Sequence, residues 1–248
     1  MRAPAPAVVV VTTLALLLLP AVDASAAPPG CGGRRASTLP AWAAERRMTV
    51  LVDSVLLGGT GALRTAMPCW RISVRGRPAL MIGAAEREVA AQRPRIAPLV
   101  VIGLGYNSLW ERARRRYGHW ASRFDGEALR LLAALRRRGA RQVVWVTLRE
   151  PTRRVVPPAG WAELRTYAWY FPYVNERLRR LDRRHDDVVL ADWAAASGRP
   201  GLTYDSIHLN ARGAARMART IEAAIVRGAR RPAPGAEAVR TPTSPSAS

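Results

Sequence analysis

Asp205 and His208 are the residues of this chain best suited to acid–base chemistry. They lie three positions apart in the segment YDSIH, residues 204–208, and the whole chain has only three histidines. In a turn, this separation lets the carboxylate accept a hydrogen bond from Nδ1 of the imidazole and leaves Nε2 free to take a proton from a nucleophile. An isolated D-x-x-H segment is more often a surface histidine near a helix start, so the prediction depends on the residues that accompany it.

Ser54 is the candidate nucleophile, and it follows Asp53 directly after the apolar run of residues 48–52. A serine at a strand-to-helix turn exposes its hydroxyl, and the N–H groups at a helix start favour developing negative charge. Asp and Ser are also common helix N-caps, so this pair taken alone is more simply explained as a cap.

Asn107 follows another apolar run, residues 99–105, and its side-chain amide could donate a hydrogen bond to an oxyanion. Two other interpretations compete. The side chain could cap the turn, or the segment GLGYNS, residues 103–108, could be a variant of the glycine-rich dinucleotide motif. The dinucleotide motif is disfavoured because no clear amphipathic helix opens directly behind these glycines.

Five apolar runs alternate with segments of helical periodicity, and the three candidate segments each follow one of the runs. The predicted strands are residues 48–52, 71–74, 99–105, 142–148 and 187–191, and the predicted helices are 55–67 (interrupted by glycines), 78–93, 124–138, 161–184 and 210–228. Continuously apolar strands that alternate with amphipathic helices indicate a parallel sheet covered on both faces. The sequence therefore predicts an α/β fold, a three-layer α/β/α sandwich. Such sheets bind ligands at the carboxyl ends of their strands.

The order Asp-Ser, G-x-N and D-x-x-H, each behind a predicted strand, resembles the SGNH or GDSL family of serine hydrolases over roughly residues 48–228. The resemblance implies a flavodoxin-like fold with a five-stranded parallel sheet, and an esterase that works through an acyl-enzyme without a cofactor. It implies that Ser54 is the nucleophile, with Asp205 and His208 as the rest of the triad.

The same resemblance implies an oxyanion hole built from Ser54 N–H, Asn107 and a glycine of a second block. Gly76 is the expected glycine, and Gly58 and Gly83 are nearby alternatives.

Two positions depart from the family pattern. Val52 stands where the family has a glycine before Asp-Ser, and Ser108 stands where an aspartate often follows the asparagine. The segment DSVLLG, residues 53–58, resembles exported actinobacterial members and domains fused to membrane acyltransferases. That form implies O-acyl groups on envelope glycans or lipids as substrates. Hydrolysis and transfer to a sugar hydroxyl are not distinguished by the sequence.

Other polar and aromatic residues near the strand ends have two interpretations each. Asp192 is either a rival triad acid or a turn cap. Arg149 and Glu150 either line a pocket or form a surface ion pair. A set of aromatic residues could form a substrate-contacting wall or helix core, namely Trp161, Tyr167, Trp169, Tyr170 and Tyr173.

The chain carries 39 basic and 18 acidic residues, a net charge of +21, and every basic residue is arginine. Without lysine, Schiff-base chemistry and the lysine of a phosphate-binding loop are excluded. The excess predicts either an anionic partner, such as an anionic cell-envelope polymer, or a compositional preference on solvated helix faces. Nucleic acid is not expected, since the arginines do not cluster with aromatic residues. The alternative function is a catalytically silent module that binds such a polymer, and a monomer is expected.

The N-terminal residues predict export. Arg2 precedes an apolar run at residues 8–19, and the small residues 24–26 (ASA) predict a signal peptide over residues 1–26 that is cleaved, with an uncleaved anchor as the alternative. Residues 27–47 are predicted to be an arm and residues 229–248 a disordered tail. The protein is expected to be secreted or associated with the cell envelope.

Cys31 and Cys69 are the only two cysteines. In an oxidising compartment they could form a disulfide that ties the arm to the domain, and two unpaired thiols are the alternative. Neither the cysteines nor the histidines have the spacing of a zinc site, so no metal is expected.

Overall fold

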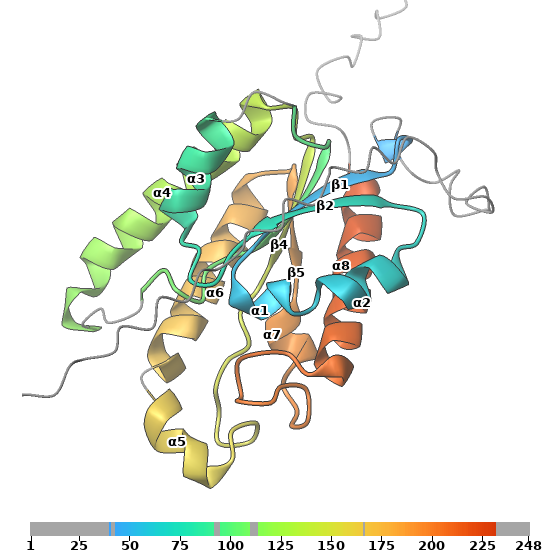
Figure 1. The fold of residues 1–248 in the computed structure, drawn as a ribbon. Helices are drawn as coiled ribbons and strands as arrows, with labels where there is room; N and C mark the ends of the chain where they lie inside the picture. The colour runs from blue at the N-terminus through green and yellow to red at the C-terminus, as the bar shows by residue number, and fades with distance from the viewer. Residues whose placement is uncertain (1–39, 41–42, 92–94, 110–113, 166, 232–248) are drawn as a thin grey trace, which may run out of the picture.

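The computed structural model describes residue 40 and residues 43–91, 95–109, 114–165 and 167–231. Its centre is a five-stranded parallel sheet in the order β2-β1-β3-β4-β5 (Figure 1). The strands are β1 (Arg47–Val52), β2 (Arg71–Gly76), β3 (Leu99–Gly103), β4 (Gln142–Val146) and β5 (Val188–Ala191). The predicted five-stranded parallel sheet is confirmed.

Helices cover both faces of this sheet. They are α1 (Ser54–Leu57), α2 (Thr60–Ala66), α3 (Ile82–Ala91), α4 (Tyr117–Arg137), α5 (Pro158–Leu164), α6 (Tyr167–Arg184), α7 (Trp193–Ala196) and α8 (Ala211–Ala229), with a short 3-10 helix, η3, at Arg114–Arg116. The helices α3, α4 and α6 form one layer, and α2 and α8 pack together on the opposite face (Figure 1). The three-layer α/β/α sandwich is therefore confirmed.

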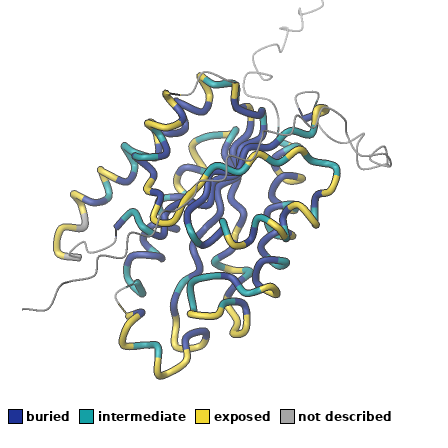
Figure 2. The backbone as a smooth tube through the Cα atoms, in the orientation of Figure 1, coloured by how far each residue is buried: buried dark blue, intermediate teal, exposed yellow. Residues whose placement is uncertain are grey.

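Burial follows the strand order. Every residue of β3, β4 and β5 is buried, whereas no residue of β2, one of the two edge strands, is buried (Figure 2). At the opposite edge, two arginines donate to outward carbonyls of β5. Arg227 donates to Leu190 O at 2.8 Å, and Arg231 donates to Val188 O at 2.5 Å. These bonds satisfy backbone acceptors that an edge strand otherwise leaves open.

Several predicted elements have different bounds in the structure. The predicted helix 55–67 is two helices separated at Gly58 and Gly59, and the predicted helix 161–184 is α5 followed by α6. Strands β3 and β4 end two residues earlier than predicted, since residues 104–105 and 147–148 leave the sheet for the loops at its carboxyl end. The four-residue helix α7 and η3 were not predicted.

The predicted signal peptide, residues 1–26, and Cys31 lie outside the described residues. A disulfide between Cys31 and Cys69 therefore stays a prediction. Residues 232–248 of the predicted tail also lie outside them, whereas Arg231 forms an ion pair with Asp182 at 2.8 Å. Among the residues that the structure describes, no helix is both long enough and apolar enough to cross a membrane.

Candidate active site at the strand ends

Ser54, Asp205 and His208 lie together at the carboxyl end of the sheet, although Ser54 and His208 are 154 residues apart in sequence. Nδ1 of His208 lies 2.6 Å from Asp205 Oδ2, and its Nε2 lies 3.0 Å from Ser54 Oγ. These distances allow Nδ1–H to donate to the carboxylate while Nε2 accepts from the serine hydroxyl. The arrangement is a continuous chain from carboxylate to imidazole to hydroxyl.

The carboxylate of Asp205 is held by its own loop. Its Oδ1 accepts the backbone N–H groups of Ile207 at 2.9 Å and of His208 at 2.6 Å. Partial burial raises the pKa of Asp205, but hydrogen bonds from the His208 side chain and from these N–H groups outweigh it and hold the pKa below its ordinary value. Asp205 is therefore ionised at neutral pH and can stabilise a positive charge on the imidazole.

Ser54 is placed by the end of β1 and the start of α1. Asp53 N–H donates to Gly103 O at 3.1 Å, and the Asp53 carboxyl accepts Val55 N–H at 3.1 Å as the N-cap of α1. Ser54 is consequently the first helical residue, where a backbone N–H has no partner within the helix. That N–H is free to serve an oxyanion.

Asn107 is tied to the residue that precedes the nucleophile. Its Nδ2 donates to Asp53 Oδ2 at 3.3 Å, and the Asp53 side chain is fully buried. Burial raises the pKa of Asp53 to about 7, against the lowering effects of Val55 N–H, the charge on His208, Tyr106 N–H and the Asn107 amide. Because an amide nitrogen carries two hydrogens, Asn107 keeps one donor for a ligand.

Gly76 is the last residue of β2 and pairs with Val52 of β1. A Cβ at this position would lie 2.2 Å from Val52 O, so no side chain fits. Both alternative glycines lie at or in a helix. Gly58 uses its N–H at the end of α1, and Gly83 lies in α3 against Glu127.

No protein-family profile matches the chain, and no curated protein sequence matches it. Solved structures do. The catalytic domain of peptidoglycan O-acetyltransferase A from Streptococcus pneumoniae, solved with a methylsulfonyl adduct, has a TM-score of 0.54 at 20% identity and covers 75% of this chain and 95% of its own. Phospholipase A1 from Streptomyces albidoflavus has a TM-score of 0.57 at 13% identity, covering 73% and 99%. A GDSL-like lipase from Bacteroides thetaiotaomicron has a TM-score of 0.56 at 13% identity, covering 74% and 89%. This chain has the SGNH hydrolase fold.

Within the SGNH hydrolase fold, Arg149 and Glu150 occupy different environments. Arg149 is 3% exposed and turns inward, whereas Glu150 accepts Asn175 Nδ2 at 2.8 Å and lies 4.0 Å from Arg179. A surface ion pair between Arg149 and Glu150, one of the two interpretations of the sequence, is therefore wrong.

Asp192 caps a helix in this SGNH fold. Its Oδ1 accepts Ala195 N–H at 3.2 Å and the Thr147 hydroxyl at 3.2 Å. This matches the turn-cap interpretation, and it is Asp205 that lies against His208.

The aromatic set divides by burial. Tyr170 and Tyr173 are helix core at 1% and 5% exposure, whereas Trp161, Tyr167 and Trp169 are half-buried. Trp161 and Tyr167 pack around a small cluster of Val155, Val156 and Leu164, and Ile207 of the Asp205–His208 loop joins it. This cluster places apolar surface beside the loop that carries the imidazole.

Tyr204 was not singled out from the sequence, yet its ring stacks on His208. The ring centroids are 5.7 Å apart with an interplanar angle of 13°, and Tyr204 is 72% exposed. Its position next to Asp205 in the sequence was the available signal. An exposed aromatic face therefore lies beside the imidazole that contacts Ser54.

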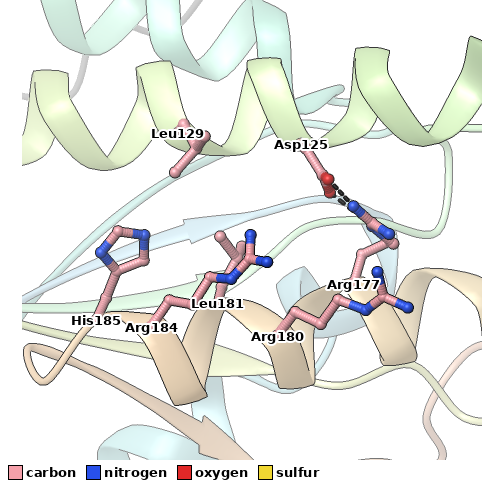
Figure 3. A pocket seen from close by; sticks show the side chains of 7 residues that line it. All are labelled: Asp125, Leu129, Arg177, Arg180, Leu181, Arg184 and His185. Carbon is pink, nitrogen blue, oxygen red and sulfur yellow. Dashed lines mark hydrogen bonds and ion pairs between the residues drawn. The ribbon is translucent and has the colours of Figure 1, made fainter.

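A cationic groove lies away from these residues, between α4 and α6 (Figure 3). It encloses about 220 Å³ and is lined by Asp125, Leu129, Arg177, Arg180, Leu181, Arg184 and His185. Asp125 pairs with Arg177, and Arg180 contacts Glu176 at 3.3 Å. Leu129 of α4 and Leu181 of α6 are its apolar lining, and its three arginines outnumber the single aspartate (Figure 3).

Proposed function

We propose that this protein is an exported serine esterase that cleaves or transfers O-acyl groups through an acyl-enzyme on Ser54. The observation that carries the proposal is the contact of Ser54 Oγ with His208 Nε2 at 3.0 Å, in a histidine whose Nδ1 lies 2.6 Å from Asp205. These contacts support the proposal, because acyl transfer by a serine needs a nucleophile, a base and an orienting carboxylate linked in this order.

Acylation begins with attack of Ser54 Oγ on the ester carbonyl carbon. The hydroxyl proton passes to His208 Nε2, and the carbonyl π electrons move onto oxygen. The resulting imidazolium is stabilised by the ionised Asp205, which keeps its charge throughout.

The developing oxyanion would be held by Ser54 N–H, Gly76 N–H and the free hydrogen of the Asn107 amide. When the carbonyl re-forms, the bond to the leaving alkoxide breaks, and the alkoxide takes the proton from His208. The acyl group then remains as an ester on Ser54.

Deacylation repeats these steps with a second hydroxyl compound. His208 takes its proton as it attacks the acyl-enzyme, and the proton returns to Ser54 when the product leaves. Water gives hydrolysis and a sugar hydroxyl gives transfer. The names of the structural neighbours include both an O-acetyltransferase and a phospholipase, which supports the reaction class and leaves the acceptor open. We propose envelope glycans or lipids as substrates, on the resemblance and the predicted signal peptide.

A binding role for the arginine surface is a second proposal. The groove between α4 and α6 offers Arg180 and Arg184 around Leu129, and it fits an anionic cell-envelope polymer by charge (Figure 3). Binding there would hold the enzyme near its substrate. Binding without esterase activity would instead indicate the catalytically silent module.

Turnover of 4-nitrophenyl acetate by the purified protein tests the esterase. Ser54→Ala should lower kcat by several orders of magnitude, about as far as His208→Ala, because the triad acts as a unit. Ser122→Ala is the matched control, since this exposed serine of α4 bonds only within its helix, at Gly118 O. A Ser54→Ala variant that keeps the wild-type turnover would overturn the proposal.

A further inference from the structure

Arg149 is a buried cation next to the loop that carries Asp205 and His208. Its side chain is 3% exposed, and burial lowers the pKa of its guanidinium from the ordinary value. Arginine nonetheless stays charged in proteins. Burying a charge costs free energy unless its donors are satisfied, so a buried arginine needs hydrogen-bond partners and indicates a specific role.

The guanidinium uses all five of its N–H donors on neutral oxygens. Nε donates to Ser197 O at 3.3 Å, Nη2 to Arg199 O at 3.0 Å and Val155 O at 3.5 Å, and Nη1 to Ser206 O at 3.0 Å and to the Thr203 hydroxyl. Four of the five acceptors belong to residues 197–206, the segment that leads into Asp205 and His208. No donor remains for a substrate.

Ser206 is the acceptor that links Arg149 most directly to the triad. It lies between Asp205 and His208, and its φ of 72° is in the left-handed region, which is uncommon for a residue other than glycine. This turn points the N–H groups of residues 207 and 208 at Asp205 Oδ1. The hydrogen bond from Arg149 to Ser206 O fixes the carbonyl of the strained residue.

The backbone from which Arg149 extends is itself held in place. Arg149 N–H donates to the hydroxyl of Tyr106 at 2.8 Å. The preceding residue, Leu148, exchanges two hydrogen bonds with the buried Asn175, at 2.7 and 2.8 Å. The guanidinium therefore connects the segment that follows β4 to the loop of residues 197–206.

We propose that Arg149 is a positioning residue that fixes the position of the Asp205–His208 loop relative to Ser54. Its catalytic consequence rests on the proposed function, whereas its effect on the loop does not. Arg149 acts through Ser206 and Thr203 and does not touch the reacting atoms. A lysine cannot replace it, because one ammonium has three donors and no planar fork to span the five acceptors.

Steady-state kinetics test the catalytic part. Arg149→Lys should lower kcat by about 10- to 100-fold, since a displacement of about 1 Å in a catalytic group can have this effect. KM should stay within about threefold, because no substrate contact is lost. In Arg149→Ala, added guanidinium ion should restore part of kcat by occupying the vacated space.

Arg231→Lys is the matched control. Arg231 also donates to a backbone carbonyl, Val188 O, and pairs with Asp182, but it lies at the opposite end of β5. This variant should keep the wild-type kcat. An equal loss of kcat in Arg149→Lys and Arg231→Lys, or no loss in Arg149→Lys, would overturn the positioning role.

A spectroscopic measurement tests the loop without any substrate. The chain has only three histidines, so the imidazole Nδ1 proton of His208 can be assigned by its absence in His208→Gln. Nuclear magnetic resonance should show this proton in the wild type and in Arg231→Lys, and show it broadened or lost in Arg149→Lys. A sharp, unchanged signal in Arg149→Lys would refute the proposal. A wild type without esterase activity would contradict the proposed function alone, and the proton signal would still decide the role of Arg149.

Discussion

The side-chain amide of Asn107 donates to the buried carboxyl of Asp53 at 3.3 Å, which links the predicted oxyanion donor to the residue before the nucleophile. Asp53 also caps the helix that Ser54 begins. One carboxyl group thereby orients two parts of the site, the start of α1 and the amide. Its removal should affect the reaction although it does not contact the reacting atoms.

Asp53→Asn should lower kcat for a small ester by about 10²-fold, the effect of losing one oxyanion donor. The new amide can still accept Val55 N–H through its oxygen, but its NH₂ faces the Asn107 donor and offers it no acceptor. KM should change by only a few fold. Asp192→Asn, at the cap of α7, is the control and should keep the wild-type kcat. A fully active Asp53→Asn variant would refute this role.

The raised pKa of Asp53 predicts a pH dependence of stability. Asp53 has a pKa of about 7 in the folded chain and an ordinary value of 3.8, so between these values the folded state retains a proton that the unfolded state has lost. The contribution of Asp53 is therefore fully present below pH 3.8 and is lost as pH rises through 7. The whole change corresponds to about 4 kcal/mol.

Urea unfolding of the wild type and of Asp53→Asn at pH 4, 6 and 8 measures this change. The free energy of unfolding of the variant should rise relative to the wild type by up to about 4 kcal/mol between pH 4 and pH 8. A difference that is the same at all three pH values would show that Asp53 does not titrate in this range.

Tyr204 presents an exposed aromatic face beside His208 and should contact the alcohol part of a bulky substrate. Tyr204→Ala should lower kcat/KM for an acetylated oligosaccharide by about 3- to 10-fold, the worth of one aromatic contact. 4-Nitrophenyl acetate, which is too small to need that contact, should be turned over within about twofold of the wild-type rate. Tyr204→Phe keeps the ring and serves as the control. Equal losses on both substrates would mean that Tyr204 supports the imidazole and not the substrate.

The groove between α4 and α6 predicts binding that depends on salt. Sedimentation with anionic cell-wall material should weaken steeply as salt rises, because exposed charges are screened beyond about 10 Å at 0.1 M. The double variant Arg180→Gln/Arg184→Gln should bind less than Arg64→Gln/Arg219→Gln, which removes the same charge from exposed positions of α2 and α8. Turnover of 4-nitrophenyl acetate should not change. Equal binding by the two double variants would show that the polymer does not bind at this groove. Binding that persists in molar salt would exclude a charge-driven contact.

The sheet could be predicted because its strands are continuously apolar and alternate with amphipathic helices. The proximity of Ser54, Asn107 and His208 was also predictable, since parallel strands bring their carboxyl ends to one edge. The catalytic roles of these residues stay predictions.

Other features of the site depend on contacts between distant residues, which no local sequence pattern predicts. From the sequence, Arg149 was a candidate for lining a pocket or for a surface ion pair, and only the loop of residues 197–206 folding over it shows why it is buried. The left-handed backbone at Ser206 could not be predicted, because the residue there is not a glycine. The bond between Asp53 and Asn107 joins residues 54 positions apart. The glycines predicted the break between α1 and α2, whereas the break between α5 and α6 was missed, since helical periodicity continues across that junction.

Labelling by a fluorophosphonate tests the proposed nucleophile most directly, because it needs no knowledge of the natural substrate. The purified wild-type protein should form one covalent adduct, and mass spectrometry of its peptides should locate it on Ser54. Labelling should be abolished in Ser54→Ala and strongly slowed in His208→Ala, in which no base activates the hydroxyl. A folded wild type that remains unlabelled, or an adduct on another residue that persists in Ser54→Ala, would contradict a Ser54 acyl-enzyme.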